Sequence, residues 1–445
     1  MFNLYLKMRK FFSLILLSVI SLTLKAQNND TLNYIKQNAI SIDTGINTIG
    51  YNDLIPLIPT LQNRRLIGMG EATHGTHEFQ AVKFRMLKFL VEKMGYRLFG
   101  IEANFTKCRQ VDDYVLYGKG DARTAINGTY FWTWKTKEML QMVEWMHTYN
   151  LNKPDTTKVK FYGFDMQYDS VACKLIKDKL IKLDSNYYKA HFYSLSNLRI
   201  AVKSSQVYTK FSKQGADSVK ALLNNIKAYI DANRVLFLKL YSAENMEYLK
   251  RDVRLVEQCL DMDLEYNKHQ YNNHGYWSDK NGSAIRTRCM AENVEWILDH
   301  EAPDSKMMIW AHNFHIGKTD MGSYLKKKYT NQYYAIGFDF NKGTFRAVDL
   351  IDHRGLTNFT VGNAEPGSSG NIFSQFNIPA FFFDIESTVK TNSPAKSFFT
   401  KTLRHRSISA GYGDTWESNM YLPEPLYSYF DGLIFINDTT PTQAM

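Results

Sequence analysis

The chain has 445 residues, of which 44% are hydrophobic and 22% are charged, and its formal net charge is +10. This composition is typical of a globular protein with a full core. The basic residues are spread along the chain, so the positive charge indicates a solvated surface, and no nucleic-acid partner is predicted.

The N-terminal segment has the pattern of a secretory signal peptide. A basic head is followed by an apolar run over 11–24, which is shorter than the ~20 residues that span a bilayer. Ala26 is a plausible cleavage position, so residues 1–26 are predicted to be a signal peptide and the protein to be periplasmic or secreted. This segment holds four of the ten net positive charges, which leaves +6 on the mature chain. No later stretch is long and apolar enough for a membrane span.

The cysteines are few and show no CxxC spacing. In an exported protein they can pair as disulfides, but a chain of this length does not need them for stability. Buried free thiols are an equal alternative for Cys108, Cys173, Cys259 and Cys289.

Several short apolar runs are typical of buried strands, and each is followed by a polar or charged residue. Their continuous apolar character suits a sheet covered on both faces. The runs are Leu66–Met69, Leu98–Ile101, 159–164, 307–311, 333–338, 381–383 and 433–436.

Helical patterns lie between these runs. From Phe79 to Val91 the apolar residues keep roughly helical spacing, and Gly95 is a natural stop. The alternation of strand and helix predicts an α/β fold with a mostly parallel central sheet flanked by helices. Because ligands bind outside the carboxyl ends of such strands, we expect the polar residues there to gather at one edge.

The chain is predicted to divide into an α/β core in two parts, 27–174 and 276–445, with a helical insertion over 175–275 between them. The insertion shows i, i+3, i+4, i+7 apolar spacing from Val219 onward, and we interpret it as a cleft wall or lid. Residues 271–279 are predicted to form a loop, as is the Gly/Ser-rich stretch 362–370 at the surface. A helix is expected from Ile285 to Leu298.

The most informative stretch is 66–79, where a strand passes through two glycines into a turn and a helix. Glu71 and His74 are three residues apart and can face the same point. A neutral histidine is the natural acceptor of a water proton, and a carboxylate can fix its tautomer. The alternative is that Glu71 caps the helix and His74 is a solvated turn residue.

Further polar residues follow other predicted strands. His312 and His315 form an HxxH pair that could donate to an oxyanion or ligate a metal; the alternative is one structural and one exposed histidine. Glu102 and Asp165 follow two more strands and are candidates for the cleft, with a salt bridge as the ordinary alternative.

Candidate substrate-binding residues are less specific. Lys83 lies on the helix after the Glu71 turn, although a surface lysine is slightly favoured there. Trp132 and Trp134, in the aromatic run 130–134, could line an apolar substrate wall or fill the core.

Five motifs in order resemble the erythromycin esterase family over residues 50–440. They are Gly70–Phe79, Gly100–Ala103, Tyr162–Gln167, Met290–Asn293 and Trp310–His315. The resemblance implies hydrolysis of the macrolactone ester of macrolide antibiotics by a histidine-activated water, without an acyl-enzyme, and hence antibiotic inactivation. It implies His74 as general base, Glu71 as its partner, and Glu102, His312 and His315 as the remaining catalytic residues. Some relatives carry Arg where this chain has Lys83.

No GxSxG element for a serine nucleophile is present. The expected partner is a small-molecule ester, and no cofactor or metal is predicted. Two rival functions stay open. The acidic and imidazole residues could hold a divalent ion in a metal-dependent hydrolase of another ester. The histidines and aromatic residues could instead bind haem or another hydrophobic ligand without catalysis.

Overall fold

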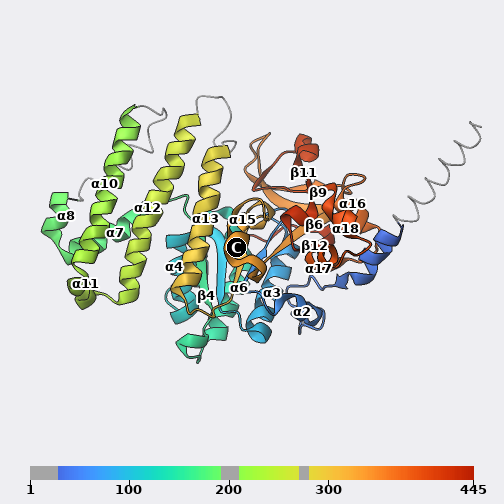
Figure 1. Ribbon diagram of the computed structural model, residues 1–445, viewed down its shortest axis with the longest axis horizontal. Coiled ribbons are helices and arrows are strands. Elements are labelled where there is room, and N and C mark those ends of the chain that lie inside the picture. Colours follow the sequence, from blue (N-terminus) through green and yellow to red (C-terminus); the bar gives the residue numbers. More distant parts are fainter. Residues whose placement is uncertain (1–28, 192–209, 270–279) are drawn as a thin grey trace, which may run out of the picture. The chain divides into compact units, whose positions relative to one another are not determined.

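The computed structural model describes residues 29–191, 210–269 and 280–445 (Figure 1). The predicted signal peptide and the predicted 271–279 loop lie outside these residues. The described chain forms two compact units. Unit 1 comprises 29–63, Met69–Met86 and Tyr334–Thr442, and unit 2 comprises Arg64–Gly68, the described part of Leu87–Tyr333, and Gln443–Met445.

Unit 2 contains a sheet with the strand order β2-β5-β3-β4. The central strand β3 runs parallel to both β4 and β5. All four strands are almost entirely buried, as the continuous apolar runs predict. Their bounds are Leu66–Met69 (β2), Leu98–Asn104 (β3), Lys160–Asp165 (β4) and Met307–Trp310 (β5).

Helices follow each of these strands. They are α4 (Phe105–Tyr117), α5 (Ala122–Asn127), α6 (Lys137–Asn150), α7 (Ser170–Leu183), α8 (Ser185–His191), α10 (Lys210–Ala232), α11 (Arg234–Leu240), α12 (Ala243–His269), α13 (Lys280–His300), α14 (Asn313–Ile316) and α15 (Met321–Tyr329). Helix α3 (His77–Met94) connects β2 to β3 and is divided between the units at Met86.

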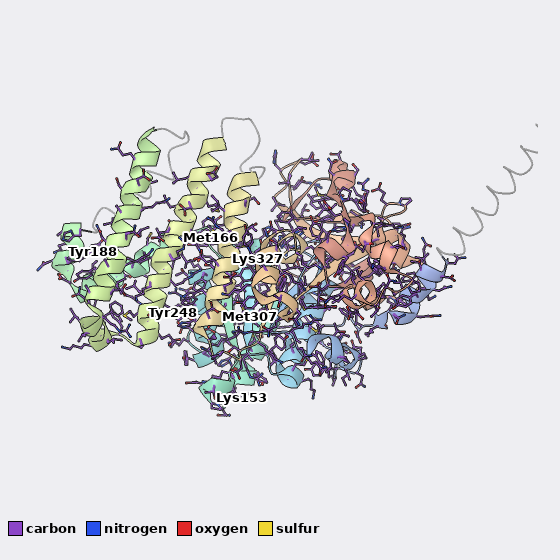
Figure 2. All side chains as sticks on the ribbon, in the orientation of Figure 1. Lys153, Met166, Tyr188, Tyr248, Met307 and Lys327 are labelled. Atoms are coloured by element: carbon purple, nitrogen blue, oxygen red, sulfur yellow. The ribbon has the colours of Figure 1, made fainter. Side chains whose placement is uncertain are left out.

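The long helices α7, α10 and α12 have a core of their own. Apolar residues of the predicted helical spacing, such as Val219, Leu223 and Ile226 of α10, are buried against α12 and α7. Tyr188 of α8 belongs to the same core and is labelled in Figure 2. The interpretation of this helical region as a lid or cleft wall stays a prediction.

Unit 1 contains a mixed sheet with the order β1-β8-β12-β6. Strand β12 is parallel to β6 but antiparallel to β8, and β7 is antiparallel to β6. The strands are β1 (Ile40–Ser41), β6 (Tyr333–Asp349), β7 (Leu356–Val361), β8 (Ala380–Asp384), β9 (Thr402–Arg406), β10 (Gly411–Tyr412), β11 (Tyr421–Pro425) and β12 (Gly432–Thr439), and the short helices are α2 (Ile58–Leu61), α16 (Ser369–Ser374), α17 (Ile385–Lys390), α18 (Lys396–Thr400) and α19 (Leu426–Tyr429).

The α/β fold with a mostly parallel sheet flanked by helices is confirmed, and each predicted apolar run is a strand. One local prediction is wrong. The last part of the Gly/Ser-rich stretch is not a surface loop, because Ser368 is the N-cap of α16 and Ser369 is buried and donates its hydroxyl to Asp339. All four cysteines are buried thiols outside any disulfide. Within the described residues, no helix combines the length and apolar character that crossing a membrane requires.

Candidate active site

The turn after β2 is fixed by its backbone. Gly70 donates its N–H to the Ile336 carbonyl at 2.8 Å, and the Gly75 carbonyl accepts N–H groups from Arg346 and Thr442, each at 3.0 Å. A Cβ on Gly75 would lie only 2.0 Å from the Arg346 carbonyl oxygen, so only glycine allows this close approach. The turn therefore holds the residues between these two glycines in a defined position.

Glu71 lies in this turn and contacts two cationic or potentially cationic partners. His74 Nδ1 is 2.5 Å from Glu71 Oε1, and Lys83 Nζ of α3 donates to Glu71 Oε2 at 2.5 Å. Glu71 and Lys83 are buried, and His74 is only 9% exposed. Lys83 also lies 5.2 Å from the centre of the Phe338 ring. We call Glu71, His74 and Lys83 the Glu71 cluster.

The charge state of this cluster follows from its contacts. Burial alone raises the pKa of Glu71, but the Lys83 charge and the hydrogen bonds outweigh it and lower that pKa to about 2. The carboxylate is therefore ionised at neutral pH and accepts a hydrogen bond from His74 Nδ1–H. That hydrogen bond selects the tautomer in which Nε2 carries the lone pair, which is the form a general base requires.

Two interpretations from the sequence are corrected here. Lys83 is not a surface lysine, because it is buried and donates to the Glu71 carboxylate. Glu71 lies six residues before the start of α3 at His77, and His74 is buried rather than solvated. The N-terminus of α3 is instead held by Glu78, whose carboxylate accepts the backbone N–H of Thr440 at 2.8 Å.

A second set of polar residues lies at the carboxyl ends of the strands of unit 2. Glu102 lies two residues before the end of β3, Asp165 is the last residue of β4, and both contact Arg286 of α13. Arg286 Nη2 donates to Glu102 Oε1 at 2.7 Å and to Asp165 Oδ2 at 2.9 Å. Its Nε donates to Asp165 Oδ1 at 3.2 Å. With His315 and Asp320, described next, these residues form what we call the Arg286 cluster.

His315 lies between two carboxylates. Its Nδ1 is 3.1 Å from Asp320 Oδ1, and its Nε2 is 3.2 Å from Glu102 Oε1. Burial and the nearby Arg286 charge lower the pKa of His315, but Glu102 and Asp320 prevail and raise it to about 9. Arg286 Nη1 lies 3.0 Å from His315 Nε2 and can only donate, so this contact fits a neutral ring, whereas the two carboxylates favour the imidazolium. The raised pKa favours the protonated ring at neutral pH, and in that form Nε2 has no lone pair with which to act as a base.

His312 contacts Glu102 through its backbone. Its backbone N–H donates to Glu102 Oε2 at 3.0 Å, and its Nδ1 accepts the N–H of Phe314 at 3.2 Å as the N-cap of α14. Because Nδ1 is an acceptor, the neutral ring carries its proton on Nε2 and can donate it. This agrees with a donor role.

The tryptophans differ in exposure. Trp134 is buried, donates its indole N–H to the Glu102 carbonyl at 3.1 Å, and packs edge-on against Trp310. Trp132 is partly exposed. Trp134 therefore supports the end of β3 from the core, and a substrate-binding role for either tryptophan or for Asp165 stays a prediction.

Arg286 and Asp320 were missed from the sequence. The signal for Arg286 was present in the Met290–Asn293 motif, since Asn293 donates to the Phe164 carbonyl at 2.8 Å and holds α13 against β4. Arg286 lies seven residues earlier, about two helical turns, and hence on the same face. Asp320 begins α15 and accepts hydrogen bonds from Thr287 at 2.8 Å.

The structure thus brings the predicted Glu71, His74 and Lys83 together in unit 1. It brings Glu102, Asp165 and His315 together in unit 2, with His312 bound to Glu102. The expectation that both sets share one sheet edge stays a prediction. In the part of the chain that the structure describes, no group of three or more His, Cys, Asp or Glu residues is arranged to hold a metal ion.

The family model for erythromycin esterase matches residues 91–439. The chain belongs to the erythromycin esterase family. A candidate hydrolase of Bacillus subtilis (strain 168), YbfO, is 24% identical over 88% of this chain and 87% of its own length. Erythromycin esterase type II of Escherichia coli is 22% identical over 77% of this chain and 88% of its own length.

Solved structures are similar across nearly the whole fold. A Bacillus cereus protein has a TM-score of 0.77 at 23% identity and covers 94% of this chain and 99% of its own. A histidine-to-asparagine variant of the erythromycin esterase EreC in its open conformation has a TM-score of 0.66 at 15% identity, covering 91% and 98%. At these identities the structures show the fold, and the family membership indicates a hydrolase that acts on a small molecule.

Proposed function

We propose that this protein hydrolyses the macrolactone ester of macrolide antibiotics with a water activated by His74, and so inactivates them. The observation that carries the proposal is the buried Glu71–His74 hydrogen bond, in which an ionised carboxylate fixes the base tautomer of the ring. Membership of the erythromycin esterase family supports the reaction class and suggests the substrate.

The proposed reaction adds one water across the ester. His74 Nε2 accepts a proton from water, and the hydroxide attacks the carbonyl carbon to give a tetrahedral oxyanion. The C–O bond to the ring alcohol then breaks, and the imidazolium returns its proton to the leaving oxygen. Glu71 stabilises that imidazolium without itself taking up a proton, since its pKa of about 2 keeps it ionised.

Donors that stabilise the oxyanion are proposed among the histidines of unit 2. Two observations support this assignment: His312 Nδ1 accepts a hydrogen bond, which leaves the proton of the neutral ring on Nε2, and the pKa of His315 is raised, which favours its protonated form. A preorganised donor is worth ~3–4 kcal/mol of activation free energy in acyl transfer.

The test is to incubate the mature protein with macrolides of different ring sizes and with simple aryl esters, and to detect by mass the addition of one water. The His74→Ala variant should lose about 10²–10⁴-fold in rate, the usual contribution of a positioned base. His353→Asn, an exposed histidine outside the family motifs, is the control and should keep full activity. Full macrolide hydrolysis by His74→Ala would refute the mechanism. Hydrolysis of aryl esters without hydrolysis of macrolides would support ester hydrolysis as the reaction and refute macrolides as the substrate.

We also propose that the protein acts outside the cytoplasm, on the support of the signal-peptide pattern in residues 1–26. N-terminal sequencing of the chain recovered from the periplasmic and extracellular fractions should find a start near Gln27. A chain that starts at Met1 and is found in the cytoplasm would refute export.

A further inference from the structure

Helix α11 has an unusually apolar surface. Its sequence, Arg234–Leu240, contains five apolar residues among seven, and only Phe237 is buried. Val235 is 73% exposed, and Leu236, Leu238 and Leu240 are each 41–42% exposed. Single exposed apolar residues are common on protein surfaces, but four within six positions form a patch that indicates a binding partner.

The fold explains why these side chains remain outside. Helix α11 connects α10 to α12 at one end of their bundle (Figure 1), where a short helix can turn only one side to the core. Phe237 takes that side and packs with the bundle core. The remaining aliphatic side chains are exposed and lie away from that core.

Basic residues border this patch. Arg234 and Lys239 lie on α11 itself and are exposed. Lys182 of α7 lies 5.6 Å from the ring of Tyr241, the residue directly after α11. Among the described residues, none of these three cations has a carboxylate within ion-pair distance. We call the four aliphatic residues and these three cations the α11 surface.

Two acids on the neighbouring helices have ion pairs of their own. Asp178 of α7 pairs with Lys174 at 2.5 Å, and Asp231 of α10 pairs with Lys250 at 2.5 Å. Neither of these carboxylates is therefore paired with a cation of the α11 surface. An apolar patch bordered by cations matches a membrane interface, where aliphatic side chains enter the acyl boundary and basic ones meet anionic headgroups.

We propose that the α11 surface binds the protein to a bilayer rich in anionic phospholipid. A second copy of the chain fits less well, because a two-fold contact through this surface would place the same cations opposite one another. Binding through α11 is peripheral and independent of the proposed hydrolytic function, since α11 contains none of the proposed catalytic residues.

The test is co-sedimentation of the mature full-length protein with vesicles of phosphatidylglycerol and phosphatidylcholine, and with phosphatidylcholine alone. Binding is expected to the anionic vesicles and to weaken as salt rises. The triple variant Lys182→Gln/Arg234→Gln/Lys239→Gln should bind about a hundredfold more weakly, at ~1 kcal/mol for each basic residue. Val235→Ser/Leu238→Ser should also lose binding. Ile49→Ser, which removes a fully exposed apolar side chain elsewhere, is the matched control and should bind normally.

Circular dichroism and thermal unfolding establish that each variant is folded. Absence of vesicle binding by the parent protein would overturn the proposal, as would equal binding by the parent and the Val235→Ser/Leu238→Ser variant. Concentration-dependent dimerisation that this variant abolishes, without vesicle binding, would assign the surface to a second copy instead.

Discussion

Replacement of Lys83 by Met tests the Glu71 cluster most directly. The substitution keeps much of the side-chain volume but removes the ammonium that donates to Glu71 Oε2 at 2.5 Å. Glu71 is buried, so its carboxylate would keep the hydrogen bond to His74 but lose the fixed positive charge of Lys83. Both the stability of the fold and the pH dependence of hydrolysis should change.

The magnitude follows from the pKa of Glu71. Its value of about 2, against an ordinary 4.5, corresponds to roughly 3 kcal/mol of favourable interaction with the ionised form, at ~1.4 kcal/mol per pKa unit. The Lys83 charge is the largest of the interactions that lower this pKa. Loss of one partner from a buried ion pair typically costs about 3–5 kcal/mol, so a destabilisation of about 3 kcal/mol is expected.

The assay is urea unfolding between pH 2 and pH 7. In the parent protein Glu71 has a lowered pKa, so its contribution is present above pH 4.5 and is lost as the pH falls toward 2. In Lys83→Met the pKa of Glu71 rises and this contribution disappears. The acid limb of kcat/KM should also move to higher pH, because Glu71 must be ionised to hold His74 and its own pKa rises when the Lys83 charge is lost.

Lys93→Met is the matched control, since Lys93 is an exposed lysine near the end of the same helix and its loss should change the free energy of unfolding by less than about 0.5 kcal/mol. Lys83→Arg retains the charge and should recover part of the stability. If Lys83→Met unfolded at the same urea concentration as the parent, with the same pH dependence, the assignment of a buried Lys83–Glu71 ion pair would be incorrect.

Three further predictions concern single residues. Because the pKa of His315 is raised to about 9, its protonated ring stabilises the fold below pH 6.5, and this stabilisation is lost as the pH rises toward 9. The free energy of unfolding in urea should therefore depend less on pH over that range in His315→Gln. An unchanged pH dependence in the variant would contradict the imidazolium. Arg286→Met leaves two buried carboxylates without their shared cation, so the free energy of unfolding in urea should fall by about 3–5 kcal/mol. The variant should also lower kcat more than it raises KM, and a normal kcat would exclude a positioning role for Arg286. Gly75→Ala should lower the yield of folded protein and the thermal midpoint, because its Cβ meets the Arg346 carbonyl; a parent-like midpoint would argue against the tight turn.

The sheet could be predicted from the sequence because it depends on local pattern. Runs such as Leu66–Met69 and Met307–Trp310 are apolar at every position, which only a strand covered on both faces requires. The antiparallel direction of β8 could not be predicted in this way, since apolar content alone does not set strand direction.

The contact between Glu71 and His74 could also be predicted from the sequence, because two side chains that are three residues apart in one turn cannot lie far from each other. The assignment of Lys83 required more. Its distance from Glu71 in sequence allowed either a surface or a buried position, and the packing of α3 against Phe338 decided for the buried one.

The sequence by itself therefore determined the strands, the turn that carries Glu71 and His74, and the family. The tertiary structure alone decided the charge of individual groups, as His315 shows most clearly. Its partner Glu102 lies more than 200 residues earlier, and Arg286 reaches both residues from a separate helix. Protonation depends on the field of charges within a few ångströms, and residues far apart in sequence supply that field only after the chain has folded.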